Sequence, residues 1–136
     1  MKRPLPIRKS VLIADDDPSV RFVLRRTIER LGCRVRVLED GAEVSEAVHD
    51  DLYNLLVLDL YMPGMNGFEV LRHLRRRAPD LLPSPRTPRD VRVLVLSSES
   101  NAATIEHARA AGADAYLTKP FDVDELAEQV RHLLRC

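Results

Sequence analysis

Acidic side chains follow two short apolar segments, and together they could bind a metal ion. Asp15 and Asp16 come directly after the apolar run at 11–14, and Asp59 follows the run at 55–58. If these runs are neighbouring parallel strands, their carboxyl ends meet at one edge of the sheet. Carboxylates brought together repel one another unless a cation neutralises them, and oxygen ligands favour Mg²⁺, Mn²⁺ or Ca²⁺ over zinc. The three acids therefore predict a divalent metal site.

An acid after a strand also has a purely structural use, because its side chain often caps the helix that follows. Asp17 precedes Pro18, a residue suited to the first turn of a helix. For Asp17 we therefore predict a capping role rather than metal binding.

A hydroxyl and an ammonium group follow two further apolar segments. Ser97 and Ser98 come after the run at 91–96, and Lys119 comes shortly after the run at 115–117. Only three of the 21 Lys and Arg residues are Lys, so a compact ammonium group at this place stands out in an Arg-rich chain. With the three acids, these groups would make an anion site in which metal, ammonium and hydroxyl surround one carboxylate.

These residues depend on a framework that alternates strands and helices. Short continuous apolar runs, typical of buried strands, alternate with segments of helical spacing. The expected strands are 11–14, 34–38, 55–58, 91–96 and 115–117, and the expected helices are 18–31, 44–48, 68–74, 105–111 and 122–134. Such alternation implies a parallel sheet with helices on both faces. The predicted fold is α/β, a doubly wound (βα)5 domain, and the strand order 2-1-3-4-5 would make the first and third strands neighbours.

Composition limits the classes of function. A chain of 136 residues with 45% hydrophobic and 31% charged residues suits one ordinary globular domain. Lys plus Arg equals Asp plus Glu at 21 each, which argues against direct nucleic-acid binding. The apolar runs are too short for a membrane span, no secretory signal is evident, and Cys33 and Cys136 form no disulfide framework. A cytoplasmic protein is expected.

The chain is expected to divide into an N-terminal extension, 1–9, and a folded domain, 10–136. Residues 78–90 contain four prolines and are predicted to form a loop between the third helix and the fourth strand. A surface excursion is favoured there over a partner-binding loop. The arginines at 75–77 are expected to be a solvated helix end, where positive charge suits the helix dipole.

The ordered motifs resemble those of response-regulator receiver domains. The matching segments are VLIADDDP at 11–18, LDLYMPGMNG at 58–67, LSS at 96–98 and TKPF at 118–121. The likeness runs from about residue 10 to residue 134. It implies a CheY-like receiver in single-domain form, with a flavodoxin-like fold of strand order 2-1-3-4-5.

The resemblance implies a role for each acid in two-component signalling. Asp59 would accept a phosphoryl group from the phosphohistidine of a sensor histidine kinase or a phosphotransfer protein. Asp16, Asp59 and the backbone carbonyl of Tyr61 would bind Mg²⁺, with Mn²⁺ as a possible substitute. Asp15 would act largely through a metal-bound water. The protein would be a phosphoacceptor switch, not an enzyme, although it would assist its own phosphoryl transfer and dephosphorylation.

The resemblance also implies which residues contact the phosphoryl group and respond to it. Ser97 and Lys119 would contact phosphoryl oxygens, and the peptide bond between Lys119 and Pro120 is expected to be cis. Ser97 would be coupled to Tyr116, the aromatic switch residue. The fourth helix, fifth strand and fifth helix would then present the surface for a downstream protein, and a homodimer is possible.

Tyr61 and Glu99 occupy the two positions that govern water access to the phosphoaspartate in this family. A bulky side chain at Tyr61 is expected to slow hydrolysis. Ser98, at a place often held by Ala or Gly, is a departure whose effect stays open.

Three alternatives stay open beside this interpretation. The first is a hydrolase that uses Asp59 as a covalent nucleophile, as haloacid-dehalogenase relatives do, but Tyr61 stands where those proteins have an acid. The second is a pseudo-receiver that folds alike without being phosphorylated, which the full set of acids, Ser97 and Lys119 disfavours. The third is a fragment of a longer regulator. No motif in the sequence identifies the cognate kinase or the downstream target.

Overall fold

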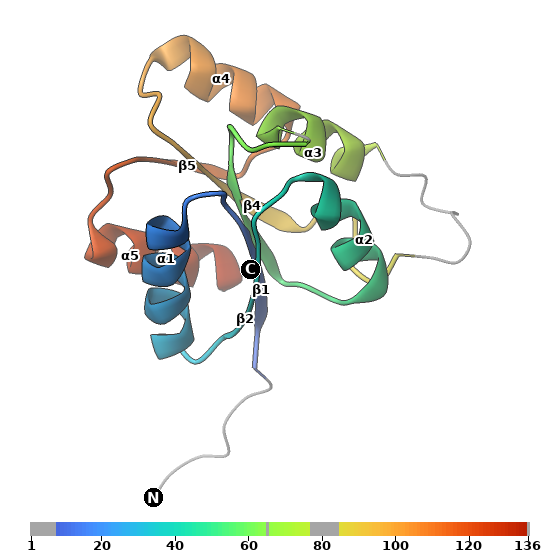
Figure 1. Cartoon of the computed structure of the whole chain (residues 1–136), viewed down its shortest axis with the longest axis vertical. Helices are drawn as coiled ribbons and strands as arrows, with labels where there is room; N and C mark the ends of the chain where they lie inside the picture. Colours follow the sequence, from blue (N-terminus) through green and yellow to red (C-terminus); the bar gives the residue numbers. More distant parts are fainter. Residues whose placement is uncertain (1–7, 65, 77–84, 136) are drawn as a thin grey trace, which may run out of the picture.

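The computed structural model describes residues 8–64, 66–76 and 85–135, in which a five-stranded parallel sheet is covered by helices on both faces (Figure 1). The strands are β1 (Ser10–Ala14), β2 (Arg34–Leu38), β3 (Leu55–Asp59), β4 (Arg92–Ser97) and β5 (Ala115–Thr118). The helices are α1 (Pro18–Arg30), α2 (Ala42–Asp50), α3 (Gly67–Arg75), α4 (Ala102–Ala111) and α5 (Val123–Leu134). The strand order β2-β1-β3-β4-β5 confirms the predicted fold class.

The burial of each strand explains its sequence pattern. β3 is buried along its whole length, and β1 and β4 are buried except at their first residue, so these strands consist of continuous apolar runs. β2 lies at the edge of the sheet and alternates exposed with less exposed residues. One apolar core lies between the sheet and α1 with α5, and a second lies between the sheet and α2, α3 and α4.

The register of the sheet brings the chemically interesting residues to one edge. Ala14 pairs with Leu58, so the residue after β1 lies beside the last residue of β3. Asp59 pairs with Leu96, and Ser97 pairs with Thr118. Asp15, Asp59, Ser97 and Lys119 therefore all lie at the carboxyl ends of neighbouring strands.

Asp17 caps α1 as predicted. Its carboxylate accepts hydrogen bonds from the backbone N–H groups of Ser19 and Val20 at 2.8 and 3.4 Å, and Pro18 is the first helical residue. The side chain of Asp17 is therefore occupied at the helix terminus, outside the carboxylate group of Asp15, Asp16 and Asp59.

The expectation of a solvated helix end is wrong for Arg75. Its guanidinium donates to the carbonyls of Gly112, Arg89 and Val91 at 2.6 to 3.2 Å and forms an ion pair with Asp114 at 3.1 Å. Burial lowers the pKa of Arg75 despite the nearby acid. Arg76 is exposed, and residue 77 lies outside the described residues. Charge spacing could not reveal that the first of three arginines ties α3 to the start of β4 and the end of α4.

The proline-rich stretch is described only from residue 85 onward, and its end is not a free surface loop. Thr87 is fully buried, and its backbone N–H donates to the carbonyl of Val48 at 3.0 Å. Its hydroxyl donates to the carbonyl of Asp51 at 2.6 Å and accepts from the N–H of Tyr53 at 2.9 Å. The predicted surface excursion is therefore wrong at Thr87, while residues 78–84 lie outside the described ranges.

Thr87→Val is expected to lower the free energy of unfolding by about 2 kcal/mol, because an isosteric methyl leaves the buried groups of Asp51 and Tyr53 without their partner. Thr87→Ser keeps the hydroxyl and is the matched control. Urea unfolding of both variants measures the difference. A Thr87→Val variant as stable as the wild type would show that the hydroxyl contributes nothing.

The described cysteine and the histidines lie outside the carboxyl edge of the sheet. Cys33 is a buried thiol with a pKa raised by desolvation, and residue 136 lies outside the described chain. The four histidines lie on helix surfaces, and His107 stacks on Phe68 with ring centroids 4.4 Å apart. Among the helices of the described residues, none has the length and apolar character that a membrane crossing requires.

Candidate functional site

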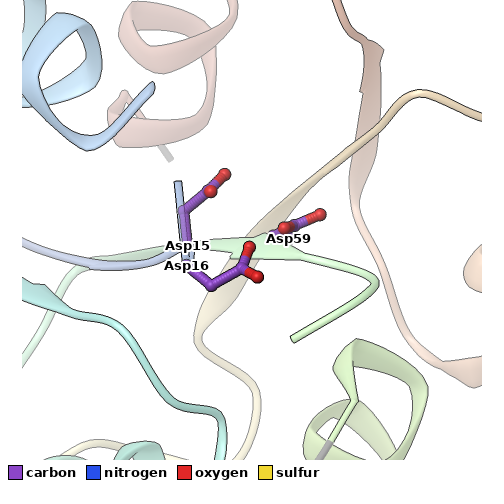
Figure 2. A group of neighbouring side chains, drawn as sticks. All are labelled: Asp15, Asp16 and Asp59. Carbon is purple, nitrogen blue, oxygen red and sulfur yellow. The ribbon is translucent and has the colours of Figure 1, made fainter. Parts of the chain in front are cut away.

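Three carboxylates meet at the carboxyl edge of the sheet (Figure 2). Asp15 and Asp16 follow β1, and Asp59 ends β3. Each offers an oxygen atom, and these atoms lie within 4.8 Å of one another. Asp15 and Asp59 are buried, whereas Asp16 is exposed. The structure thus brings together the three acids that the sequence analysis singled out as metal ligands.

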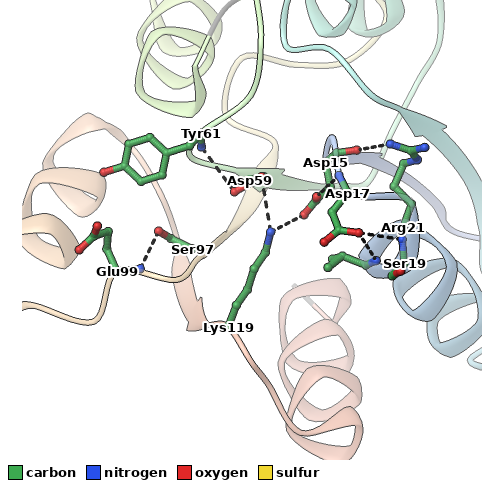
Figure 3. A network of polar contacts seen from close by, with 10 residues as sticks. Asp15, Asp17, Ser19, Arg21, Asp59, Tyr61, Ser97, Glu99 and Lys119 are labelled. Atoms are coloured by element: carbon green, nitrogen blue, oxygen red, sulfur yellow. Dashed lines mark hydrogen bonds and ion pairs between the residues drawn. The ribbon is translucent and has the colours of Figure 1, made fainter.

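The ammonium group of Lys119 reaches two of these acids (Figure 3). Its Nζ lies 2.8 Å from Asp15 Oδ2 and 3.4 Å from Asp59 Oδ2. The backbone N–H of Lys119 donates to the carbonyl of Ser97 at 2.7 Å, which fixes this residue directly after β5. The Lys119–Pro120 peptide bond is cis, as expected.

Asp15 is held in place by its own loop and by α1. Its Oδ1 accepts from the backbone N–H of Asp17 at 2.9 Å, and its carbonyl accepts from Arg21 Nη1 at 2.9 Å. Arg21 also pairs with Glu39 at 3.5 Å. The sequence analysis missed Arg21, because nothing in its spacing distinguishes it from the other arginines of α1.

Electrostatics at this edge favour an added cation. Burial and, after it, the nearby Asp15 carboxylate raise the pKa of Asp59 to about 6, although Lys119 and the Tyr61 N–H act in the opposite direction. Burial opposes the charge on Lys119, but the bonds to Asp15 and Asp59 outweigh burial and raise its pKa. Three carboxylates against one ammonium leave an excess of negative charge. A divalent metal with oxygen preference fits this donor set.

Ser97 and Tyr116 are linked through the backbone of one residue. Ser97 is fully buried, and its Oγ accepts from the N–H of Glu99 at 3.0 Å. The Tyr116 hydroxyl donates to the carbonyl of the same Glu99 at 2.6 Å. The sequence suggested a role only for the Glu99 side chain. Residue types do not show which backbone groups will form hydrogen bonds, so this backbone bridge could not be predicted.

Tyr61 lies at the rim of the site. Its backbone N–H donates to Asp59 Oδ1 at 3.4 Å, and 52% of its side chain surface is exposed. The Glu99 carboxylate is also exposed and accepts from the Asn101 side chain at 3.3 Å. Both side chains are therefore exposed and do not close over the acids.

Gly67 is a further site residue that the sequence analysis missed. A Cβ atom at this position would lie 2.8 Å from both the Asp59 carbonyl oxygen and the Leu60 Cα, closer than real Cβ contacts allow. The Gly67 N–H donates to the Leu60 carbonyl at 2.8 Å. The start of α3 can therefore approach the end of β3 only because residue 67 has no side chain. A glycine at the start of the helix that follows Asp59 was the available signal in the sequence.

Comparison with known proteins identifies the family to which a chain with this site belongs. A model of the response regulator receiver domain matches residues 11–131. The chain belongs to this family. It is therefore a receiver domain of two-component signalling, and receiver domains bind Mg²⁺ through an acidic pocket such as the Asp15, Asp16 and Asp59 group.

Relatives with names and solved structures agree with this membership. Response regulator MprA of Mycobacterium ulcerans (strain Agy99) is 38% identical over 125 residues, which are 92% of this chain and 50% of that protein. The chain thus spans about half the length of the curated relatives it matches. A putative response regulator from Chloroflexus aurantiacus is 26% identical with a TM-score of 0.84, covering 95% of this chain and 99% of that one. The Francisella response regulator 1452 receiver domain is 29% identical with a TM-score of 0.83, covering 94% and 98%.

Proposed function

We propose that the protein accepts a phosphoryl group on Asp59 from the phosphohistidine of a sensor histidine kinase or phosphotransfer protein. It then acts as an interaction switch and not as an enzyme on an external substrate. The observation that carries this proposal is the convergence of buried Asp59 with Asp15, Asp16 and Lys119 at one edge of the sheet. Family membership makes such partners the natural donors.

The proposed transfer uses Asp59 as the nucleophile. A carboxylate oxygen attacks phosphorus, the new O–P bond forms, and the bond to the imidazole nitrogen of the donor breaks. Asp59 is mostly ionised above its pKa of about 6, so the nucleophile is available at neutral pH. Lys119 lies 3.4 Å from Asp59 and can pair with a phosphoryl oxygen. Such transfer depends on positioning and charge neutralisation rather than on covalent help.

The proposed metal ligands are Asp16, Asp59 and the backbone carbonyl of Tyr61, with Asp15 acting through water. When bound, Mg²⁺ neutralises charge on the carboxylates and on the incoming phosphoryl oxygens. Both Asp15 oxygens are already engaged, by the Asp17 N–H at 2.9 Å and by Lys119 at 2.8 Å, which supports the indirect role of Asp15. Mn²⁺ fits the same oxygen donors.

The proposed switch runs from Ser97 to Tyr116. Ser97 Oγ accepts from the Glu99 N–H, which leaves its own proton for a phosphoryl oxygen. A shift of Ser97 would move Glu99, to whose carbonyl the Tyr116 hydroxyl is bonded. Tyr116 lies on β5, so α4, β5 and α5 are the proposed surface for a downstream protein or for a second copy. We also propose that residues 1–9 are an extension ahead of the receiver domain, which would comprise residues 10–136. A cytoplasmic location is part of the same proposal.

Labelling with acetyl phosphate tests the proposal. We expect the protein to acquire one acid-stable, base-labile phosphoryl group in the presence of Mg²⁺ and none with excess chelator. A histidine kinase that autophosphorylates is the second donor. Absence of label from either donor would favour the pseudo-receiver alternative.

Tyr61→Ala is expected to shorten the lifetime of the phosphorylated protein severalfold, because a large side chain two residues after Asp59 would restrict the approach of water to the phosphorylated carboxylate. The decay of label after removal of the donor measures this lifetime. Tyr61→Phe keeps the ring and is the control. An unchanged lifetime in Tyr61→Ala would contradict the proposed shielding.

A further inference from the structure

A basic pocket lies at the amino end of the sheet, the edge opposite Asp59. Its cationic lining residues are Arg8 and Lys9 ahead of β1, Arg34 at the start of β2, and Arg86 near the end of the proline-rich stretch. Asp51 is the acidic residue of the lining. Because the strands are parallel, this pocket cannot share residues with the carboxylate site.

The backbone holds these segments together. The Arg34 N–H donates to the Lys9 carbonyl at 2.8 Å, and the Arg86 N–H donates to the His49 carbonyl at 3.0 Å. Ser10 exchanges hydrogen bonds with Asn54, from its N–H to the side-chain oxygen at 2.8 Å and from the Asn54 N–H to its carbonyl at 2.8 Å. The cations are therefore brought to one hollow by the paired chain and not by chance side-chain positions.

Among the described residues, the positive charges in this pocket have little compensation. Within residues 8–64, 66–76 and 85–135, the side chains of Arg8, Lys9, Arg34 and Arg86 make no hydrogen bond or ion pair. Asp51 is already paired with Arg36 at 3.5 Å, outside the lining. Four cations around one concave surface create a positive potential that attracts anions and that a concave shape focuses.

Size and lining indicate the kind of anion. The pocket volume is 460 Å³, within the range of small-molecule sites and not of an extended groove for a polymer. Three of the four cations are arginines, whose guanidinium groups match phosphate oxygens in pairs. Leu52, half exposed in the lining, offers an apolar contact. The N-terminal segment 1–7 carries Lys2 and Arg3 and no acid, so its charge does not suit this pocket.

We propose that this basic pocket binds a phosphorylated small molecule with at least two linked phosphate groups. Arg34 and Arg86 hold the phosphates from two sides, Arg8 and Lys9 complete the charge, and Leu52 contacts the organic part. The site would work beside the phosphorylation of Asp59 and independently of it.

Isothermal titration calorimetry with inorganic pyrophosphate and with ATP tests this proposal. Chelator is present throughout, so that no metal bridges the ligand to the carboxylate site. We expect a dissociation constant below about 1 mM for pyrophosphate at low salt and tighter binding of ATP. Arg34→Ala and Arg86→Ala should each weaken binding about tenfold, because each removes charge-assisted hydrogen bonds. Arg109→Ala, which removes an exposed arginine on α4, should bind as the wild type does.

Each outcome decides the proposal. Circular dichroism spectra and urea unfolding midpoints of both pocket variants should match those of the wild type, which confirms that they fold. Perturbed amide resonances of Ser10 and Asn54 on adding pyrophosphate would locate the ligand in the pocket. Absence of binding, equal binding by the pocket variants and the wild type, or binding of an acidic peptide but not of pyrophosphate would overturn the proposal. None of these results depends on phosphorylation of Asp59.

Discussion

Asp59→Asn is expected to reduce Mg²⁺-dependent labelling by acetyl phosphate at least about a hundredfold, to background. The carboxylate is the proposed nucleophile, and an amide oxygen carries no charge and attacks phosphorus poorly. The substitution also removes one of the three acids that form the metal group, so positioning is lost together with the acceptor. Radiolabel or intact mass, measured at equal protein concentration, gives the result directly.

Asp17→Asn is the matched control for this experiment. It makes the same change of carboxylate to amide close to the metal group, but Asp17 serves as the cap of α1, a position that Asn also fills. Its label should equal that of the wild type. Label that survives in Asp59→Asn would mean a different acceptor, and the proposed function would then be wrong.

The second large effect concerns stability without metal. Asp59 has a pKa of about 6 in the folded protein against 3.8 as the ordinary value. The folded state therefore binds more protons between these two values, and the free energy of unfolding must fall as pH rises through this window. At 1.36 kcal/mol per pKa unit, the loss is up to about 3 kcal/mol and is complete above pH 7.

Asp59→Asn should remove this loss. We expect the variant to be more stable than the wild type by about 2 kcal/mol at pH 8 in chelator, with the difference shrinking toward pH 4, because its amide cannot ionise. Urea unfolding at several pH values measures the difference. Mg²⁺ should reduce it at pH 8 by binding the folded wild type.

Glu46→Gln is the control for the pH series, since Glu46 is an exposed carboxylate on α2. Its stability should follow that of the wild type at every pH. A wild-type stability that stays flat from pH 4 to pH 8, or a variant that is less stable at pH 8, would contradict the raised pKa of Asp59.

The order and type of the elements could be predicted because each has a local cause. Continuous apolar runs such as 55–58 are typical of strands buried on both faces, and β3 is buried throughout. Pro18 after Asp17 predicted the start of α1, because proline suits the first turn of a helix and the preceding acid can cap it. The fourth strand begins one residue later than predicted, since the Val91 N–H bonds to Pro88 in a turn and not to the sheet. The apolar character of Val91 alone does not distinguish a residue in a turn from the first residue of a strand.

The sequence by itself determined the α/β class and the candidate acids, because runs of apolar residues and carboxylates at their ends are local features. The tertiary structure decided which side chains meet. Asp15 and Lys119 are 104 positions apart, and no local pattern signals their 2.8 Å contact, which depends on sheet order and register. The same holds for the backbone of Glu99 that joins Ser97 to Tyr116, for the contacts of partly buried Arg75, and for the four cations of the basic pocket. Contacts between distant segments depend on how the elements pack, and residue type does not encode that packing locally.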